Sequence, residues 1–352
     1  MQVMGDVTQS SGFYTAGSAI KGLVIGTSCT SIGSYAFFYC SGLAGSLTIP
    51  DSVTAIGNYA FYNCSSLTGS LNIPDSVATI GRFAFGFCGG FDGSLTISNS
   101  VTTIGSRAFY FCNGLTSLTI PDGVTTIESF AFNYCNGFTG SLVIPDSVTT
   151  IGNRAFYGCG GFDGSLTISN SVTIIDFEVF SNCNGLTGSL TIPDGVTTIN
   201  ARAFDNCTGL NGTLTLPNGI DTIGSAAFEF CSLTGNLDIP DSVTSIGTFC
   251  FRDNNFTSVT IGSGLAAIPN GLLYFCASMT GTLVLPATVS SVGNNAFNGC
   301  AFTRIEYYIT APPATSSAPF GGGNNATEIH VPAASSWVAA STWNGLTVIK
   351  DL

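Results

Sequence analysis

The chain has 352 residues, only 8% of them charged, and its 20 acidic against 8 basic residues give a net charge of −12. A nucleic-acid-binding surface needs a basic stripe that releases counterions from phosphates, and an anionic membrane attracts the same sign, so neither partner is expected. No stretch approaches the roughly 18 consecutive apolar residues of a membrane-spanning helix, so we expect no direct membrane insertion.

Residues 1–22 do not follow the pattern of the rest of the chain, and we expect them to form an N-terminal cap or a degenerate coil. A stack of repeats needs a cap because its terminal coil otherwise exposes apolar core and an unpaired strand edge. Residues 1–20 also lack the basic start and apolar middle of a secretion signal. The sequence therefore leaves the export route open.

Residues 23–303 consist of one unit that returns twelve times at steps of 22–24 residues. The marker of each unit is the residue that ends a Leu-Thr-Ile triplet or its variant: Ile25, Ile49, Ile73, Ile97, Ile120, Ile144, Ile168, Ile192, Leu216, Ile239, Ile261 and Leu285. A unit this short cannot bury its own apolar side and must stack on its neighbours. The period therefore predicts a solenoid with one continuous core.

Each unit is read as four segments. Ser-Leu-Thr-Ile at 46–49 alternates polar and apolar residues and predicts a short strand with Leu and Ile inward. Pro-Asp-Ser at 50–52 predicts a turn, and Val-Thr-Thr-Ile at 101–104 a second extended piece. Gly57-x-x-Ala60-Phe61-x-x-Cys64 predicts one tight helical turn with Ala, Phe and Cys inward, after a glycine that relaxes the backbone at a corner.

Two constant columns are expected inside the stack. Phenylalanine recurs as an aromatic spine at Phe37, Phe61, Phe85, Phe109, Phe132, Phe156, Phe180, Phe204, Phe228, Phe251 and Phe297, with Leu273 as the exception. Cysteine recurs at Cys40, Cys64, Cys88, Cys112, Cys135, Cys159, Cys183, Cys207, Cys231, Cys276 and Cys300, with Asn254 in the remaining unit. Equivalent residues of stacked coils lie about 4.8 Å apart with parallel side chains, whereas a disulfide needs converging ones. We therefore predict a ladder of buried free thiols; Cys29 and Cys250 replace apolar core residues elsewhere in the unit.

The pattern Leu-x-Ile-Pro-x-x-Val-x-x-Ile-Gly-x-x-Ala-Phe-x-x-Cys resembles the BspA-type leucine-rich repeat. The resemblance spans about residues 23–303 and implies a right-handed leucine-rich-repeat-like β-solenoid. It also implies a place at the cell surface or outside the cell, where many members bind host or matrix proteins or other cells. The resemblance identifies no ligand.

After Cys300 the rhythm ends, and residues 304–352 are predicted to form a small C-terminal cap of strands and one helix. Strands are expected at 304–309, 328–331 and 346–349, with a loop at 310–325. Pro332 is placed to open a helix at 333–341. Trp337 and Trp343 are expected to pack over the last coil, and a tryptophan-based ligand site there is the alternative.

The positions beside the Ala-Phe pair vary from coil to coil and predict the functional site. In the N-terminal half they are rich in aromatic residues and arginine, and we name eleven of them the flanking residues: Tyr35, Tyr59, Tyr62, Phe83, Phe87, Arg107, Tyr110, Phe130, Tyr134, Arg154 and Tyr157. If Ala, Phe and Cys point inward, these side chains point at least partly outward. Aromatic residues and arginine are enriched at interaction hot spots and, exposed together, mark binding patches. The alternative is that they fold over the turn as a second hydrophobic layer.

No catalytic constellation is recognisable in the sequence. His330 is the single histidine, and there is no CxxC pair, so neither a triad, a zinc site nor a cofactor is expected. Calcium bridging between Asp51 and Asp75, and a Ser/Thr lattice on the strand face that orders water or binds glycans, are weaker alternatives. The sequence thus predicts a non-enzymatic module that binds a host or matrix protein or a surface glycan. The alternative is a structural spacer or virion appendage, and oligomeric state stays open.

Overall fold

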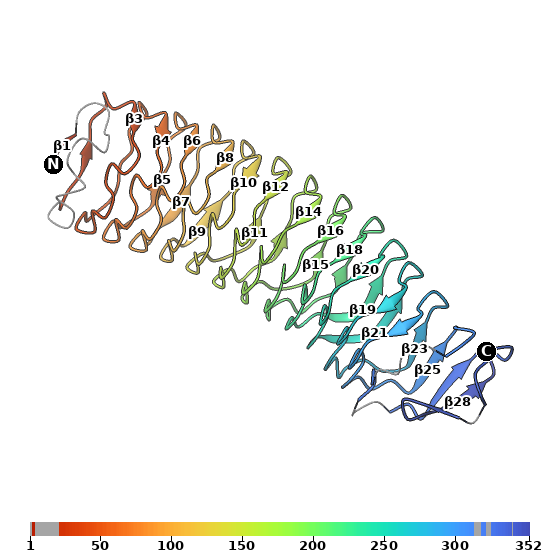
Figure 1. Ribbon diagram of the computed structural model, residues 1–352. Coiled ribbons are helices and arrows are strands. Elements are labelled where there is room, and N and C mark those ends of the chain that lie inside the picture. Colours follow the sequence, from red (N-terminus) through yellow and green to blue (C-terminus); the bar gives the residue numbers. More distant parts are fainter. Residues whose placement is uncertain (1, 4–20, 313–317, 322–324, 340) are drawn as a thin grey trace. The chain divides into compact units, whose positions relative to one another are not determined.

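A computed structural model of the protein describes residues 2–3, 21–312, 318–321, 325–339 and 341–352 (Figure 1). The chain divides into two compact units. Unit 1 comprises Met1–Val172 and Asp176–Leu186, and unit 2 comprises Thr173–Ile175 and Thr187–Leu352. The predicted boundaries at residues 22 and 303 remain predictions, and most of the predicted N-terminal cap lies outside the described residues.

Unit 1 is a stack of coils joined by parallel strands (Figure 1). The Thr-Ile segments form one six-stranded sheet of β3 (Ser31–Ile32), β4 (Ala55–Ile56), β6 (Thr79–Ile80), β8 (Thr103–Ile104), β10 (Thr126–Ile127) and β12 (Thr150–Ile151). The Ser-Leu-Thr-Ile segments form β5 (Leu71–Asn72), β7 (Ser94–Thr96) and β9 (Ser117–Thr119), and then β11 (Leu142–Val143) with β13 (Leu166–Thr167). At the N-terminal end β1 (Gln2–Val3) pairs with β2 (Val24–Ile25). Pairing joins residues one repeat apart, as in Ile56 with Ile80, so the sequence period sets the register.

Unit 2 continues the same two strand types. The first comprises β14 (Ile174–Ile175), β16 (Thr198–Ile199), β18 (Thr222–Ile223) and β20 (Ser245–Ile246), and then β22 (Ala267–Ile268) with β24 (Ser291–Val292). The second comprises β15 (Leu190–Thr191) with β17 (Leu214–Thr215), and β19 (Thr234–Ile239) with β21 (Asn255–Ile261). A five-stranded sheet closes unit 2, in the order β23 (Thr282–Leu285), β25 (Arg304–Tyr307), β26 (Glu328–Val331), β28 (Leu346–Lys350) and β27 (Thr342–Trp343). The predicted β-solenoid of about twelve coils is confirmed.

The aromatic spine and the thiol ladder form the core, as predicted. In unit 1 the spine rings from Phe37 to Phe180 are fully buried, and successive centroids are 5.0–5.8 Å apart. All thirteen cysteines are buried and free. The Sγ of Cys88 donates to the carbonyl of Phe61 in the preceding coil at 2.9 Å, and the ladder repeats this bond. Asn254, which replaces cysteine in one coil, makes the equivalent hydrogen bond: its Nδ2 donates to the Phe228 carbonyl at 2.7 Å.

The predicted helical turn at Gly-x-x-Ala-Phe-x-x-Cys is wrong: no described residue of the chain is helical. Two residues of each turn adopt left-handed backbone angles, such as Tyr59 (φ 57°) and Asn63 (φ 58°). Amides then alternate in direction: Phe61 donates to Ala84 of the next coil at 2.7 Å, whereas Cys64 donates back to Phe61 at 3.1 Å. Because half of these amides bond across the stack, they are not available for a helical ladder.

Gly57, which begins this turn in its coil, is constrained by space and not by its own backbone angle. A Cβ atom on Gly57 would lie 2.5 Å from the amide nitrogen of Ser34 in the preceding coil. The expectation that this glycine relaxes strain at a corner is therefore wrong. At Gly57 a side chain would collide with the backbone of the preceding coil. Four other coils carry Glu128, Asp176, Asn200 and Pro269 at the equivalent position.

The C-terminal region has the predicted strands without the predicted helix. Residues 333–339 form turns and bends, and residue 340 lies outside the described residues. Trp337 is buried, and its Nε1 donates to the Ile309 carbonyl at 3.3 Å. Trp343 packs on Phe320, whose ring stacks on Phe297 of the last coil. The two tryptophans cover the end of the core as predicted, and the buried Trp337 ring argues against a ligand site there.

Candidate functional site

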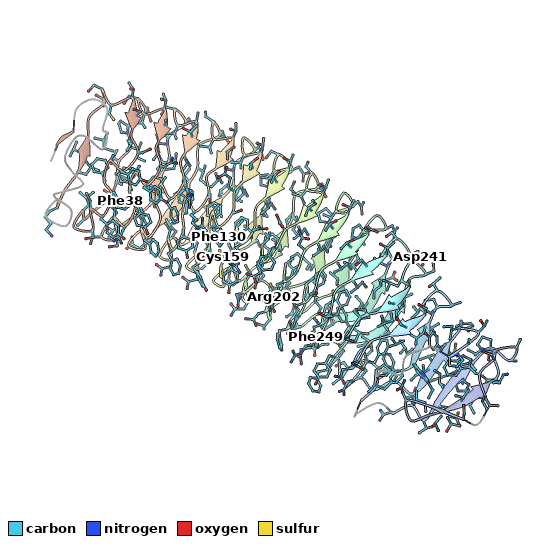
Figure 2. The ribbon with its side chains drawn as sticks, viewed as in Figure 1. Phe38, Phe130, Cys159, Arg202, Asp241 and Phe249 are labelled. Atoms are coloured by element: carbon cyan, nitrogen blue, oxygen red, sulfur yellow. The ribbon has the colours of Figure 1, made fainter. Side chains whose placement is uncertain are left out.

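The flanking residues all belong to unit 1 and stand in three columns beside the buried spine. Figure 2 shows the side chains of the chain and labels one of these residues, Phe130. The first column holds the residue just before Ala-Phe in each coil: Tyr35, Tyr59, Phe83, Arg107, Phe130, Arg154 and Glu178. The second column holds the residue just after the spine phenylalanine, as at Tyr62 and Tyr157, and the third column the next residue, as at Phe87 and Tyr134. Residues 23 or 24 apart in the sequence thereby become neighbours.

The first column forms a continuous ladder of rings and guanidinium groups. The Tyr59 ring stacks on Tyr35 and on Phe83 with centroids 5.0 Å apart in both pairs. The Arg107 Cζ then lies 5.4 Å from the Phe83 centroid and 4.1 Å from that of Phe130. Cations over ring faces contribute roughly 0.5–1 kcal/mol at exposed sites. These side-chain contacts add to the backbone hydrogen bonds that connect successive coils.

Arg154 ends the ladder and is neutralised by a buried carboxylate. Its Cζ lies 5.7 Å from the Phe130 centroid, and its Nε donates to Glu178, whose side chain is 6% exposed. This hydrogen bond raises the pKa of the Arg154 guanidinium. The face around Arg154 therefore carries little uncompensated charge.

The second and third columns interlock with one another. Phe87 stacks on Phe111 at 5.2 Å, and Phe111 contacts Tyr134 at 4.7 Å. Tyr134 meets Tyr157 edge to face at 5.4 Å. Burial, followed by a hydrogen bond with the Tyr134 hydroxyl, raises the pKa of the Tyr157 phenol. The Tyr157 phenol is therefore neutral, and its hydroxyl group can donate and accept hydrogen bonds.

The structure supports part of each interpretation of the flanking residues. Tyr134 is 38% exposed, and the other ten are half-buried. Their rings do form a second layer over the turn, as the alternative interpretation expected, yet that layer has an open outer side. Tyr39, which belongs to the third column but not to the predicted set, is 49% exposed.

The backbone beneath these side chains is one that large residues seldom adopt. Every member of the first column from Tyr35 to Glu178 has φ between 53° and 62°. Left-handed angles cost a non-glycine residue roughly 1–2 kcal/mol, whereas glycine or asparagine tolerates them well. An aromatic pair returns about 0.5–1.5 kcal/mol, so stacking offsets much of this cost.

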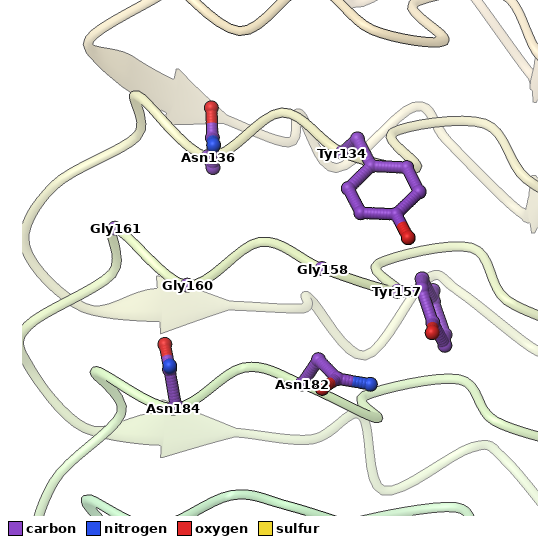
Figure 3. Close-up of a pocket in the computed structure, with 8 residues that line it drawn as sticks. All are labelled: Tyr134, Asn136, Tyr157, Gly158, Gly160, Gly161, Asn182 and Asn184. Atoms are coloured by element: carbon purple, nitrogen blue, oxygen red, sulfur yellow. The ribbon is translucent and has the colours of Figure 1, made fainter.

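The sequence did not reveal a depression in the third column (Figure 3). It has a volume of about 380 Å³ and is lined by Tyr134, Asn136, Tyr157, Gly158, Gly160, Gly161, Asn182 and Asn184. Gly158 stands where neighbouring coils carry Tyr134 and Asn182, and Gly160 where they carry Asn136 and Asn184. The segment Gly158-Cys-Gly-Gly161 indicates this depression, because glycine leaves two side-chain positions vacant in one coil.

His330 has an ionic environment that the sequence could not show. Its Nδ1 lies 2.9 Å from both carboxylate oxygens of Asp351, and its Nε2 lies 3.0 Å from Nη1 of Arg304. A guanidinium group only donates hydrogen bonds, so Nε2 accepts and the ring proton is on Nδ1. Nε2 is thereby engaged by Arg304, which argues against its use as a general base.

Two aspartates of the Pro-Asp turns, Asp146 and Asp241, accept hydrogen bonds from backbone amides of the next coil. Oδ1 of Asp146 accepts from the Asn170 amide at 2.8 Å, and Oδ1 of Asp241 accepts from the Ser263 amide at 2.6 Å. These bonds to Ser263 hold the pKa of Asp241 below its usual value. Within the described part of the chain, no three His, Cys, Asp or Glu side chains are grouped to hold a metal ion, and none of the described segments forms a helix that spans a membrane.

Comparison with known proteins decides the family. The family description "BspA type Leucine rich repeat region (6 copies)" matches residues 8–139, 92–211 and 186–304. The chain belongs to the BspA-type leucine-rich repeat family. Its constant columns accordingly belong to the BspA-type repeats, and the positions of the flanking residues vary from coil to coil.

Two solved structures are similar to this chain, and the first of them agrees with the BspA-type fold. A leucine-rich repeat protein of Bacteroides ovatus is 25% identical with a TM-score of 0.57, over 87% of this chain and 83% of the other. A leucine-rich cell surface protein of Faecalibacterium prausnitzii is 26% identical with a TM-score of 0.48, over 85% and 83%. No curated protein sequence matches the chain.

Proposed function

We propose that this chain is a non-enzymatic recognition module, acting at a cell surface or outside the cell, that binds a protein or glycan through the flanking residues. One observation carries the proposal. Aromatic and arginine side chains occupy consecutive coils of unit 1 at left-handed backbone positions, where smaller residues would cost less. Backbone strain that persists in a repeated motif points to a use for the side chain.

The partly exposed outer side of these columns supports contact with a ligand. Aromatic and arginine side chains dominate binding hot spots because they bury much area with few rotatable bonds. Here Tyr59 and Phe83 are already fixed by their ring neighbours, so binding would cost little additional side-chain entropy. The BspA-type family resemblance supports the proposed place at the surface.

A structural spacer is the second candidate, and a specific observation favours it. The same rings contact one another across coils, so stacking alone accounts for part of their presence. A spacer would use the flanking residues only to stabilise unit 1. The two candidates differ in whether removing a ring changes binding or only stability.

Replacing Phe83 with asparagine distinguishes the recognition module from the structural spacer. Asparagine suits the left-handed angle, and Asn295 holds the same column position with φ 55°, so Phe83→Asn removes the ring without adding strain. We expect binding to a ligand found on arrays of matrix proteins and glycans to weaken by roughly 30-fold, or about 2 kcal/mol. Affinity is measured by surface plasmon resonance.

The matched control is Phe249→Asn in unit 2, which makes the same change in the same column, where φ is 57°. This variant is expected to bind like the unmodified chain. Equal affinity of the Phe83→Asn variant and the unmodified chain for every array ligand would contradict the proposed face and favour the spacer.

A further inference from the structure

The depression in the third column is one coil wide because one coil lacks two side chains. Tyr134 and Asn136 bound it on one side, and Asn182 and Asn184 on the other (Figure 3). The intervening coil contributes backbone at Gly158, Gly160 and Gly161. Since neighbouring coils lie about 4.8 Å apart, the bounding coils are separated by roughly twice that distance.

The glycines also determine where the wall side chains lie. A Cβ atom on Gly158 would be 2.7 Å from Cδ1 of Tyr134, and one on Gly160 would be 2.4 Å from Oδ1 of Asn184. The tyrosine ring and the amide therefore lean over the glycine backbone from opposite coils. Tyr157 lies at the same end of the depression as Tyr134, away from Asn136 and Asn184 (Figure 3).

The chemistry of this lining is neutral and rich in hydrogen-bonding groups. None of the eight lining residues carries a formal charge. The amides of Asn136 and Asn184 are exposed and, among the described residues, neither side chain has a hydrogen-bond partner. Each amide therefore offers two donors and an acceptor to a ligand, beside the apolar face of the Tyr134 ring.

We propose that this depression binds one pyranose ring of a neutral glycan. A pyranose has an apolar face of C–H groups, which fits an exposed tyrosine ring, and hydroxyl groups around its edge, which fit asparagine amides. A volume of about 380 Å³ lies at the small end of ligand sites. This inference rests on the proposed recognition function and names the ligand class for one part of the same face.

Charged glycans and protein segments fit the site less well. Arg154, the nearest cation among the flanking residues, is neutralised by Glu178, and the net charge of −12 repels sialylated or sulfated sugars. A stable protein interface buries about 800 Å² on each partner, which a depression one coil wide does not supply.

Filling the depression tests the proposal. Gly160→Asn puts into this coil the residue that both neighbouring coils already carry at Asn136 and Asn184, and it displaces only the flexible end of the Asn184 side chain. The probe is an array of neutral oligosaccharides of glucose, galactose, mannose and N-acetylglucosamine. We expect the unmodified chain to bind at least one of them, with affinity lowered roughly tenfold or more in the Gly160→Asn variant.

The matched control is Gly89→Asn, where a Cβ atom would likewise meet only an asparagine side chain, Oδ1 of Asn113 at 2.5 Å. It is expected to leave glycan binding unchanged. The thermal unfolding midpoint of all three proteins is measured alongside, and we expect it to be the same within a few degrees.

Three results would overturn the inference: no binding to any neutral glycan, unchanged affinity in the Gly160→Asn variant, or binding confined to sialylated or sulfated glycans. A different result would distinguish the proposed function from the sugar site. Binding of a matrix protein that depends on Phe83 but not on Gly160 would sustain the recognition face while excluding the sugar site.

Discussion

Replacing Phe132 with alanine is expected to lower the free energy of unfolding of unit 1 by about 3–5 kcal/mol. The Phe132 side chain is fully buried, and its ring stacks on Phe109 and Phe156 at 5.3 Å on both sides. Truncation removes both stacked contacts and leaves a cavity between coils that are too regular to collapse. Urea unfolding followed by circular dichroism measures the loss.

Phe230→Ala is the matched control, because this ring is 40% exposed and belongs to the third column. Exposed substitutions of this kind change stability by about 0.5 kcal/mol. Similar losses for Phe132→Ala and Phe230→Ala would mean that the spine does not support the stack more than its surroundings do.

The folded protein is expected to unfold steeply between about pH 9 and pH 12 under reducing conditions. Burial raises the pKa of Cys88, Cys183, Cys231 and Cys276 to about 12, whereas a cysteine in an unfolded chain titrates near pH 8.5. Above that pH the unfolded chain releases these protons and the folded chain keeps them. Each thiol then lowers the unfolding free energy by about 1.4 kcal/mol per pH unit, and the four together lower it by roughly 5.5 kcal/mol per pH unit.

The sign of this effect follows from the direction of the shift. The raised pKa values leave the stabilisation complete below about pH 8.5, and it is lost as the pH rises towards 12. Urea midpoints measured in dithiothreitol at successive pH values give the slope, and Cys183→Ala should reduce it by about 1.4 kcal/mol per pH unit. Unchanged stability from pH 8 to pH 11 would show that the thiols are not buried.

The repeat core was predictable because the same physical requirement acts in every coil. Phe61, Cys64 and Ile73 recur one period later because each packs on the equivalent residue of the neighbouring coils. The sequence therefore repeats the same core residues through twelve units. In-register pairing such as Ile56 with Ile80 follows from the same period. Ala, Phe and Cys at spacings of one and three fit a helical turn as well as they fit the observed turn with two left-handed residues. This ambiguity led to the wrong prediction of a helical turn.

The signal against a helix was present in the less regular coils. Asn182, Asn206 and Gly158 occupy the third column, where left-handed angles are observed, and these residue types favour such angles. The aromatic members of the same columns masked that signal, since bulky residues seldom adopt left-handed backbone. Tertiary stacking in this case outweighs local preference.

Exposure of the flanking residues could not be predicted from the sequence. Whether Tyr134 faces solvent depends on the neighbours that reach over it, here Phe111 and Tyr157. The depression beside it depends on two glycines whose effect appears only when three coils are stacked. Only in that arrangement do Asn136 and Asn184 face each other across the depression.

The constant columns are buried by stacking, whereas the third column reaches solvent. Hydroxyl-radical footprinting of the folded protein with mass spectrometry measures both at once. We predict rapid oxidation of Tyr39 and Tyr134, with Cys88 and Phe85 protected until urea unfolds the chain. Oxidation of Cys88 in the folded protein as fast as in the unfolded chain, or protection of Tyr134 equal to that of Phe85, would contradict the account.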